Sequence, residues 1–189
     1  TAGVVGMSGA GKTTLLQILG TLDRATSGKV LYGGQDVTDL RADEMASFRN
    51  RSVGFVFQAH NLLPEFSVLE NVTLPCLIAR MEPAEARRRA VALLEEVGLS
   101  DRLAHRTGEI SGGEQQRTAI CRALVMEPSV LLADEPTGNL DRTTASGVVD
   151  LLLALNRSRG LSLLMVTHND QIASRLHRVI RIDDGRIAS

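Results

Sequence analysis

Short apolar runs alternate with longer segments of helical periodicity along this chain. Four runs are almost entirely apolar, as expected for strands that are covered on both faces of a sheet. They are Gly3–Val5, Val53–Phe57, Val130–Ala133 and Leu163–Thr167. Because these runs alternate with helical patterns, the sequence predicts an α/β fold with a mainly parallel sheet. The segment "RVIRIDDGRIAS" is predicted to add two strands joined at Asp184-Gly185, a dipeptide typical of hairpin turns.

The chain becomes mainly helical between Gln58 and Pro128. In "PAEARRRAVALLEEVG", Pro83 suits a first helical turn and Gly98 suits the end of the helix. One apolar stripe runs along this helix, formed by Ala86, Ala90, Leu93, Leu94 and Val97. The run Arg87, Arg88 and Arg89 is interpreted as its solvated side.

This change of pattern predicts a helical subdomain inserted into an α/β core. The core is assigned to residues 1–58 and 112–189, and the helical subdomain to residues 59–111. The chain begins with Thr1, and only a short strand precedes the first motif described below. We therefore expect N-terminal strands of the fold to be missing from this sequence.

Composition excludes several function classes. A net charge of −1 over 189 residues gives no general attraction to nucleic acid, so no nucleic-acid partner is predicted. Cys76 and Cys121 stand alone, and we interpret both as buried, reduced side chains without a metal. The apolar runs "VVDLLLAL" and "LSLLMV" fall short of the roughly 20 residues that span a bilayer. A membrane role would therefore come through a partner.

The stretch "GMSGAGKT", Gly6 to Thr13, fits the phosphate-loop pattern G-x-x-x-x-G-K-[ST]. A strand precedes it and the helical run "KTTLLQILGTL" follows, as that motif requires. Lys12 is predicted to reach the β- and γ-phosphates of a nucleotide, and the Thr13 hydroxyl to hold Mg²⁺. The full predicted phosphate-binding set is Gly6, Ser8, Gly9, Ala10, Gly11, Lys12, Thr13 and Thr14.

Candidate catalytic residues follow the other predicted strands. "VLLADE" delivers Asp134, which suits Mg²⁺, and Glu135, which suits deprotonation of the attacking water. His168 ends "LSLLMVTH" and is predicted to contact the γ-phosphate or the water. Gln58 closes "VGFVF", from which its side chain is predicted to reach Mg²⁺ or the water. The remaining histidines have no comparable setting and are interpreted as structural: His60, His105 and His177.

A second Ser-Gly-Gly turn, "ISGGE" at Ile110–Glu114, precedes the helical run "EQQRTAICRALVME". In this order, the motifs resemble those of the nucleotide-binding subunits of ABC transporters. "GMSGAGKT" corresponds to Walker A, Gln58 to the Q-loop, "ISGGEQQR" to the signature and "VLLADE" to Walker B. "NLD" at Asn139–Asp141 corresponds to the D-loop, and His168 to the switch histidine. The resemblance covers essentially the whole chain and implies a RecA-like P-loop NTPase core.

This resemblance implies ATP and Mg²⁺ as ligands and a head-to-tail dimer with a second copy of the chain. Ser111, Gly112 and Gly113 would then grip the γ-phosphate of an ATP bound by the partner copy, and Asp141 would cross the interface. It also implies integral membrane permease subunits as partners, at the cytoplasmic face of the bacterial inner membrane. Their docking residues after Gln58 would be Leu62, Leu63, Pro64 and Phe66, for which core packing is an equally favoured interpretation.

Three longer stretches narrow the resemblance: "FVFQAHNLLPEFSVLENV", "ADEPTGNLD" and "LNRSRGLSLLMVTHND". They resemble the ABC ATPases of lipoprotein-releasing systems, with MacB-type efflux and FtsE-type cell-division ATPases as related alternatives. A soluble ABC ATPase acting on DNA or ribosomes would carry coiled-coil insertions, zinc-binding cysteine pairs or a second cassette. We find none of these features in this sequence, which disfavours that class. A P-loop kinase or GTPase would leave "ISGGE" unexplained, and the guanine motif N-K-x-D does not occur.

Three positions depart from the family pattern. The aromatic residue that stacks on adenine lies upstream of Walker A in the family, before the start of this sequence, and Tyr32 is not a substitute for it. Asn169 stands where Asp is common, and Ile110 where the signature has Leu. The last two changes keep the shape and polarity of the side chain.

Overall fold

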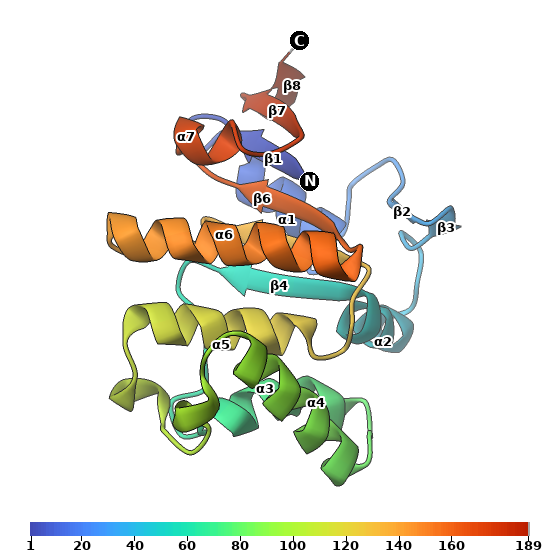
Figure 1. Cartoon of the computed structure of the whole chain (residues 1–189). Helices are drawn as coiled ribbons and strands as arrows, with labels where there is room; N and C mark the ends of the chain where they lie inside the picture. The colour runs from blue at the N-terminus through green and yellow to red at the C-terminus, as the bar shows by residue number, and fades with distance from the viewer. Residues whose placement is uncertain (189) are drawn as a thin grey trace.

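A six-stranded sheet runs through the centre of the structure, a computed structural model that describes residues 1–188 (Figure 1). Its strand order is β4-β5-β6-β1-β7-β8. The strands are β1 (Ala2–Val5), β4 (Val53–Phe57), β5 (Val130–Asp134), β6 (Ser162–Val166), β7 (Arg178–Asp183) and β8 (Arg186–Ala188). All neighbouring pairs are parallel except the β7–β8 hairpin. The predicted α/β fold is confirmed, and the four predicted apolar strands agree with the observed ones to within one residue at each end.

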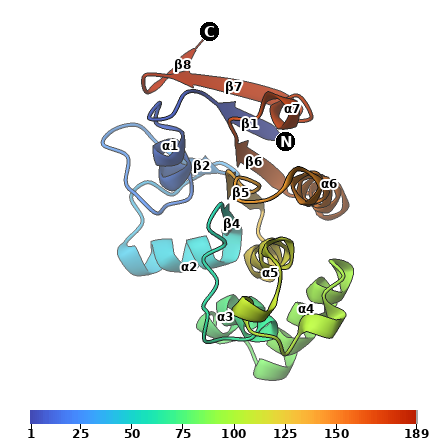
Figure 2. The ribbon, with the colours of Figure 1, turned by 90° about the vertical axis from the view of Figure 1, so that its left-hand side faces the viewer.

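Helices cover both faces of this sheet. α1 (Lys12–Leu19) lies on one face and α6 (Arg142–Arg159) on the other (Figure 2). Beneath α1, a cluster of buried residues that includes Leu16, Leu132 and Val166 fills the first layer. On the opposite face a larger cluster continues from α6 into the helical part of the chain. The strands are therefore buried on both sides, which explains their continuous apolar sequence.

The helical part contains α3 (Val68–Ile78), α4 (Pro83–Glu96) and α5 (Gly112–Leu124), with the short 3₁₀ turns η1 (Ser100–Arg102) and η2 (Thr107–Glu109). The predicted apolar stripe of α4 is buried, and Gly98 follows the helix with a left-handed φ of 72°. α5 contacts α3 and α4 as well as β4. α5 therefore packs against both the helical part and the sheet, and no single boundary separates the two. The assignment of residues 59–111 to a helical subdomain remains a prediction.

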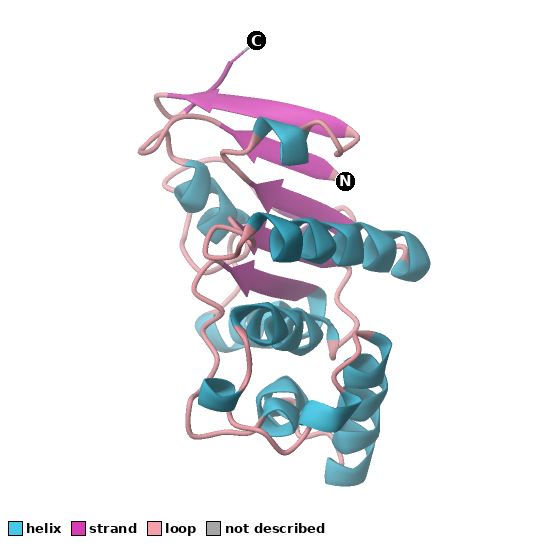
Figure 3. Cartoon of the chain, turned by 60° about the vertical axis from the view of Figure 1, so that its left-hand side comes forward, coloured by secondary structure: helices cyan, strands magenta, loops and turns pink. Residues whose placement is uncertain are grey.

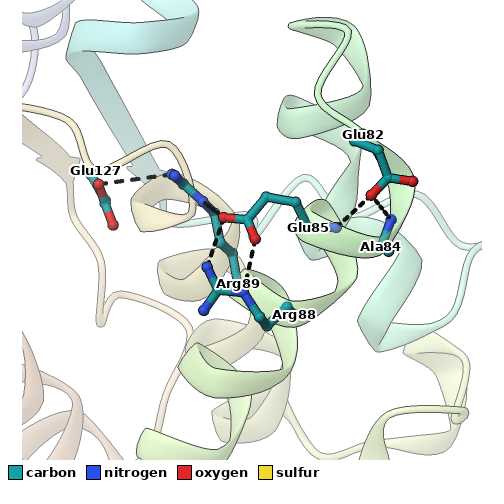
Figure 4. Close-up of polar contacts among 6 residues, drawn as sticks. All are labelled: Glu82, Ala84, Glu85, Arg88, Arg89 and Glu127. Atoms are coloured by element: carbon teal, nitrogen blue, oxygen red, sulfur yellow. Dashed lines mark hydrogen bonds and ion pairs between the residues drawn. The ribbon is translucent and has the colours of Figure 1, made fainter.

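The three consecutive arginines of α4 differ in their surroundings, and Figure 4 shows the contacts of Arg88 and Arg89. Arg87 and Arg88 are exposed, as predicted for a solvated side, and Arg88 Nε donates to Glu85 Oε2 at 2.8 Å. Arg89 is only partly exposed: it donates to Glu85 Oε1 at 2.7 Å and lies 3.8 Å from Glu127, in the loop after α5. The uniform solvated interpretation is therefore wrong for Arg89, because its side chain ties α4 to the end of α5.

Both cysteines are buried, as predicted. Burial raises the pKa of the Cys121 thiol to about 12, so this side chain stays protonated at neutral pH. Burial also raises the pKa of Cys76 above its ordinary value. Neither group is a reactive thiolate, which agrees with their interpretation as small apolar side chains.

Four elements were not anticipated from the sequence. They are the hairpin strands β2 (Leu31–Tyr32) and β3 (Gln35–Asp36) and the helices α2 (Ala42–Ser52) and α7 (Asp170–Ala173). Tyr32 donates its hydroxyl hydrogen to the carbonyl of Leu19, and its ring meets Phe48 edge to face with centroids 5.0 Å apart. Tyr32 therefore fastens the hairpin to α1, which agrees with excluding it as the adenine-stacking residue.

The parallel strands all point the same way, and the loops that follow them gather at one edge of the sheet (Figure 3). Ligands of open α/β sheets bind at this carboxyl edge. It carries the loop after β1 with the start of α1, and the ends of β4, β5 and β6 with the residues that follow them. These segments contain the predicted site residues other than Ser111, Gly112 and Gly113, which lie at the start of α5.

Candidate functional site

The phosphate loop lies between β1 and α1 and leaves the start of α1 open. Gly9 and Gly11 adopt left-handed backbone conformations, with φ of 82° and 95°. Gly11 is the N-cap of α1, and no side chain caps the helix. The first N–H groups of α1 therefore point toward the cleft with no side-chain acceptor, which is the geometry that binds phosphate. Lys12 Nζ donates to the carbonyls of Gly6, at 2.9 Å, and Met7, at 2.8 Å.

A polar cleft of about 310 Å³ opens in front of this loop. Two of the three predicted magnesium ligands meet there: the Thr13 hydroxyl donates to Asp134 Oδ2 at 3.1 Å. Among residues 1–188 no group of three or more His, Cys, Asp and Glu side chains could hold a metal alone. Thr13 and Asp134 fit Mg²⁺ nevertheless, because that ion is held in nucleotide sites by one or two carboxylates together with phosphate oxygens and water.

Glu135 lines this cleft and lies against His168, which lines the neighbouring hollow beside α6. His168 Nδ1 is 2.8 Å from Glu135 Oε1, and the Glu135 side chain is 17% exposed against 75% for His168. The backbone N–H of Glu135 donates to the Val166 carbonyl at 3.0 Å. Its φ of 46° is a left-handed conformation that non-glycine residues rarely adopt and that concentrates at functional sites. The imidazole thus orients a carboxylate that can accept a proton from water.

Gln58 is bonded to the D-loop rather than to the magnesium ligands. Its Nε2 donates to Asn139 Oδ1 at 3.0 Å, and Asn139 Nδ2 donates back to the Gln58 carbonyl at 3.1 Å. Gly138 makes room for this pair, because a Cβ there would come within 2.7 Å of Gln58 Nε2. A role of Gln58 at Mg²⁺ remains a prediction, and it requires the amide to leave Asn139.

The signature turn forms the start of α5. Ser111 is the N-cap: its N–H donates to Glu114 Oε2 at 2.8 Å, and its Oγ accepts from the Glu114 N–H at 3.3 Å. This is a capping box, which fixes the start of a helix. Arg102 adds a bond from its Nε to Glu114 Oε1 at 3.0 Å. These bonds, first those from Ser111, lower the pKa of Glu114 to about 2.

Replacing Glu114 with Gln should therefore weaken the chain in a pH-dependent way. The folded pKa lies below the ordinary value of 4.5, so the carboxylate stabilises the fold above that pH and loses this contribution as the pH falls toward 2. At pH 7 we expect a loss of about 1 kcal/mol, or about 2–4 °C in Tm. Urea unfolding of both proteins from pH 7 to about pH 2.5 would check this, because the contribution is lost between the unfolded and the folded pKa. A difference that stays constant over this range would contradict it.

The D-loop lies next to the signature turn within the same chain. Asp141 is the N-cap of α6, and its Oδ1 accepts from the N–H groups of Thr143, at 3.0 Å, and Thr144, at 3.1 Å. The bonds from Thr144 contribute most to lowering the pKa of Asp141 below its ordinary value. Gly113 fits closely against Thr144, because a Cβ on Gly113 would come within 2.6 Å of its methyl group.

The signature turn is separate from the phosphate loop. The described residues that line the P-loop cleft come from the loop, from α1 and from the ends of β5 and β6, and Ser111 and Gly112 are exposed elsewhere. The chain thus presents two predicted phosphate-binding turns that do not form one pocket. The family model for ABC transporters matches residues 1–138. The chain belongs to the ABC transporter family.

Known ABC proteins resemble this cassette over nearly its whole length. It is 57% identical to the lipoprotein-releasing system ATP-binding protein LolD of Syntrophus aciditrophicus, over 98% of this chain and 83% of that protein. It is 52% identical to LolD of Coxiella burnetii, over 98% of this chain and 80% of that protein. The resemblance to ABC transporter ATPases that the motifs indicated is therefore confirmed.

Solved structures resemble the cassette just as completely. The dimeric structure of the bacterial ABC transporter cassette MJ0796 has a TM-score of 0.89 and 40% identity, over all of this chain and 83% of that one. A second dimeric structure of MJ0796, with the same TM-score and identity, is a post-hydrolysis state bound to ADP and Pi. Because this cassette has the same fold and family, it is a nucleotide-binding ABC ATPase.

Two buried amides of this ABC cassette were not identified from the sequence. Asn71, on α3, accepts from the Leu63 N–H at 2.8 Å and donates to three carbonyls, those of Leu63, Phe66 and Ser67. Gln116, on α5, donates to the Pro136 carbonyl at 2.7 Å. A sequence feature that could have identified them is a polar residue at a helix position where apolar residues are expected, such as Asn71 in "VLENV".

Proposed function

We propose that this chain is the ATP-hydrolysing subunit of a lipoprotein-releasing ABC complex at the cytoplasmic face of the bacterial inner membrane. The observation that carries the ATPase part is the separation of the phosphate loop, with its Glu135–His168 pair, from an exposed signature turn in the same chain. A second copy, placed head to tail, would supply Ser111 and Gly113 to the γ-phosphate. The dimeric state of MJ0796 and the names of the LolD relatives support this proposal.

The described contacts suggest what each side chain does during turnover. Lys12 leaves the carbonyls of Gly6 and Met7 for the phosphates of ATP. Thr13 and Asp134 would hold Mg²⁺, which supplies charge neutralisation on the phosphate oxygens. Glu135 accepts a proton as a water oxygen bonds to the γ-phosphorus, and the bond to the bridging oxygen of ADP breaks. Loss of the γ-phosphate removes the contact that joins the two copies, so the dimer reopens.

A groove between the edge strand β4 and the helices α2, α3 and α5 suits a membrane partner. A hollow of about 390 Å³ lies between α2, β4, α3 and α5, and apolar side chains such as Phe57, Leu74 and Ile78 line much of it. Of the described residues that line it, only Arg49 and Arg122 are charged. An amphipathic cytoplasmic helix that carries a carboxylate is complementary to such a groove. Among residues 1–188 no helix is both long and apolar enough to cross a membrane itself.

The loop beside this groove supports docking rather than core packing for most of the predicted docking residues. Leu63 is 38% exposed and Phe66 is 36% exposed, and Pro64 is exposed as well, whereas Leu62 is half-buried. Hydrogen bonds between the Asn71 side chain and the backbone of Leu63 and Phe66 hold this loop in one conformation. The loop can therefore expose apolar side chains while its backbone stays ordered. We therefore propose Leu63, Pro64 and Phe66 as docking residues.

The proposal is tested by reconstitution. Tagged cassette, expressed in a bacterial host together with its membrane partner, should co-purify with that partner. In proteoliposomes, Mg-ATP should release a fluorescent triacylated lipoprotein into the soluble fraction when an acceptor is present. ATP hydrolysis without release would favour the efflux or cell-division alternatives. Stimulation of hydrolysis by DNA or ribosomes in place of the membrane partner would contradict the proposal.

Replacing Phe66 with Asp should weaken the docking contact selectively. Burying a new carboxylate in an apolar contact is unfavourable, and we expect binding of the membrane partner to weaken by about tenfold or more. ATP binding by the isolated cassette should stay unchanged, because Phe66 is far along the chain from the phosphate loop and is not among the residues that line its cleft. Leu31→Asp, at another exposed apolar side chain, is the matched control. Equal losses in both variants would contradict the assignment.

A further inference from the structure

Arg122 is a partly buried arginine that binds backbone carbonyls rather than a carboxylate. It lies near the end of α5, where its Nη1 donates to the Asn61 carbonyl at 2.6 Å and its Nη2 to the His60 carbonyl at 2.9 Å. Burial lowers the pKa of its guanidinium. None of the ion pairs found within residues 1–188 includes it. A partly buried charge without a counter-ion is unfavourable, so the two hydrogen bonds from Arg122 to one loop require a reason.

The loop that Arg122 grips has an uncommon conformation. His60 and Asn61 are successive non-glycine residues in the left-handed region, with φ of 46° and 51°. Such residues persist only where their surroundings hold them. The planar guanidinium fork holds both carbonyls at once, which the single ammonium of a lysine cannot do in the same geometry. The loop follows Gln58 directly and leads into the docking residues Leu63, Pro64 and Phe66.

α5 connects this loop to the signature turn. Ser111 caps the start of α5, and Arg122 follows eleven residues later, which is about 16 Å along a helix. Between them, the Gln116 amide donates to the carbonyl of Pro136, the residue after Glu135. One helix therefore contacts the loop after Gln58, the segment after Walker B and the signature turn. A helix is stiff over this length, so displacement of one end moves the other.

We propose that Arg122 is a positioning residue that transmits displacement of the His60–Asn61 loop by the membrane partner through α5 to the Ser111 turn. The inference rests on the proposed function, because it assumes that a membrane partner docks beside this loop. Arg122 also lines the docking groove, so the partner contacts the loop and the fork at the same place. A partner that presses on the loop would shift α5 as a body and change how Ser111 meets the γ-phosphate on the other copy.

The decisive variant is Arg122→Lys, which keeps the charge and loses the fork. In the reconstituted complex we expect the stimulation of ATP hydrolysis by the membrane partner to fall at least fivefold. Binding of a fluorescent ATP analogue to the isolated cassette should change less than twofold. Hydrogen exchange of the isolated chain should accelerate in both residues 59–62 and residues 110–114. Arg87→Lys, at an exposed arginine of α4, is the matched control and should change none of these.

A second variant tests the same contact by changing the loop instead of Arg122. His60→Gly with Asn61→Gly leaves Arg122 in place but removes the rigidity of the loop, because glycine adopts many conformations. It should reduce stimulation as Arg122→Lys does, and it decides the question if Arg122→Lys fails to fold.

Three outcomes would overturn the inference. Normal stimulation in both variants would show that the link does not transmit the signal. Normal stimulation in Arg122→Lys, with a loss in the double glycine variant, would mean that the partner requires the positive charge and not the paired hydrogen bonds of the guanidinium. A parallel loss of thermal stability and ATP binding would reduce Arg122 to a structural residue. Absence of stimulation in the unmodified complex would contradict the proposed function instead, and hydrogen exchange of the isolated chain would still test the link.

Discussion

Replacing Glu135 with Gln should reduce ATP turnover by about 10²–10⁴-fold, the range associated with loss of a general base. The amide has nearly the same shape as the carboxylate but cannot accept the proton of the attacking water. Glu135 approaches His168 at 2.8 Å and lies at the back of the P-loop cleft, so the exchange changes chemistry rather than folding. Turnover is measured as phosphate release from Mg-ATP.

The same variant should accumulate as a dimer. Because ATP then persists between the two copies, light scattering should report twice the monomer mass with Mg-ATP and the monomer mass without it. Glu65→Gln, at an exposed glutamate outside the cleft, is the matched control and should neither lose turnover nor dimerise persistently. A Glu135→Gln protein that stays monomeric at saturating Mg-ATP would remove the main support for a head-to-tail dimer.

Replacing Ser111 with Arg should abolish hydrolysis while the isolated chain still binds ATP. The signature turn is exposed and is not part of the P-loop cleft, so a bulky cation there blocks only the contact with the other copy. Loss of one preorganised contact to a transition state costs about 10²–10³-fold in rate, and the steric block adds to it. Ser111→Ala separates two effects, because it also loses the N-cap, worth about 1 kcal/mol, without the block.

Mixing two inactive variants distinguishes a shared site from a site within one chain. Lys12→Ala lacks a working phosphate loop, and Ser111→Arg lacks a working signature turn. In a head-to-tail pair of one of each, the intact loop of one chain meets the intact turn of the other. Activity should therefore return in the mixture. If each chain contained a complete site, the mixture would stay as inactive as its components.

The sequence was sufficient where a residue's role depends on its immediate neighbours. Val130–Asp134 could be predicted as a buried strand because every position but the last is apolar, and the phosphate loop follows from local glycine spacing. β2, β3 and α2 were missed because they are short or largely polar, without a clear periodic pattern. The hairpin is held by the contact of Tyr32 with α1, and α2 by contacts with β4 and Tyr32, and no local window contains these partners.

Contacts between distant segments were the other part that the sequence could not provide. Gln58 and Asn139 are 81 residues apart, and each alone is an unremarkable amide. Arg122 and Asn61 are likewise 61 residues apart, in a segment where arginine on a helix suggests only a solvated side chain. The residue types of the site could be read from motifs, but the links that join those motifs depend on the folded chain.

The central position of β1 has a consequence for how the protein forms during synthesis. Gly3 of β1 pairs with Met165 of β6 and with Val179 of β7, which lie far later in the sequence. The ribosome must therefore release the segments that form β6 and β7 before the strand ahead of the phosphate loop has neighbours on both sides. Long-range parallel pairing of this kind forms late and slowly. A nascent chain should therefore acquire affinity for ATP only after β6 and β7 have emerged.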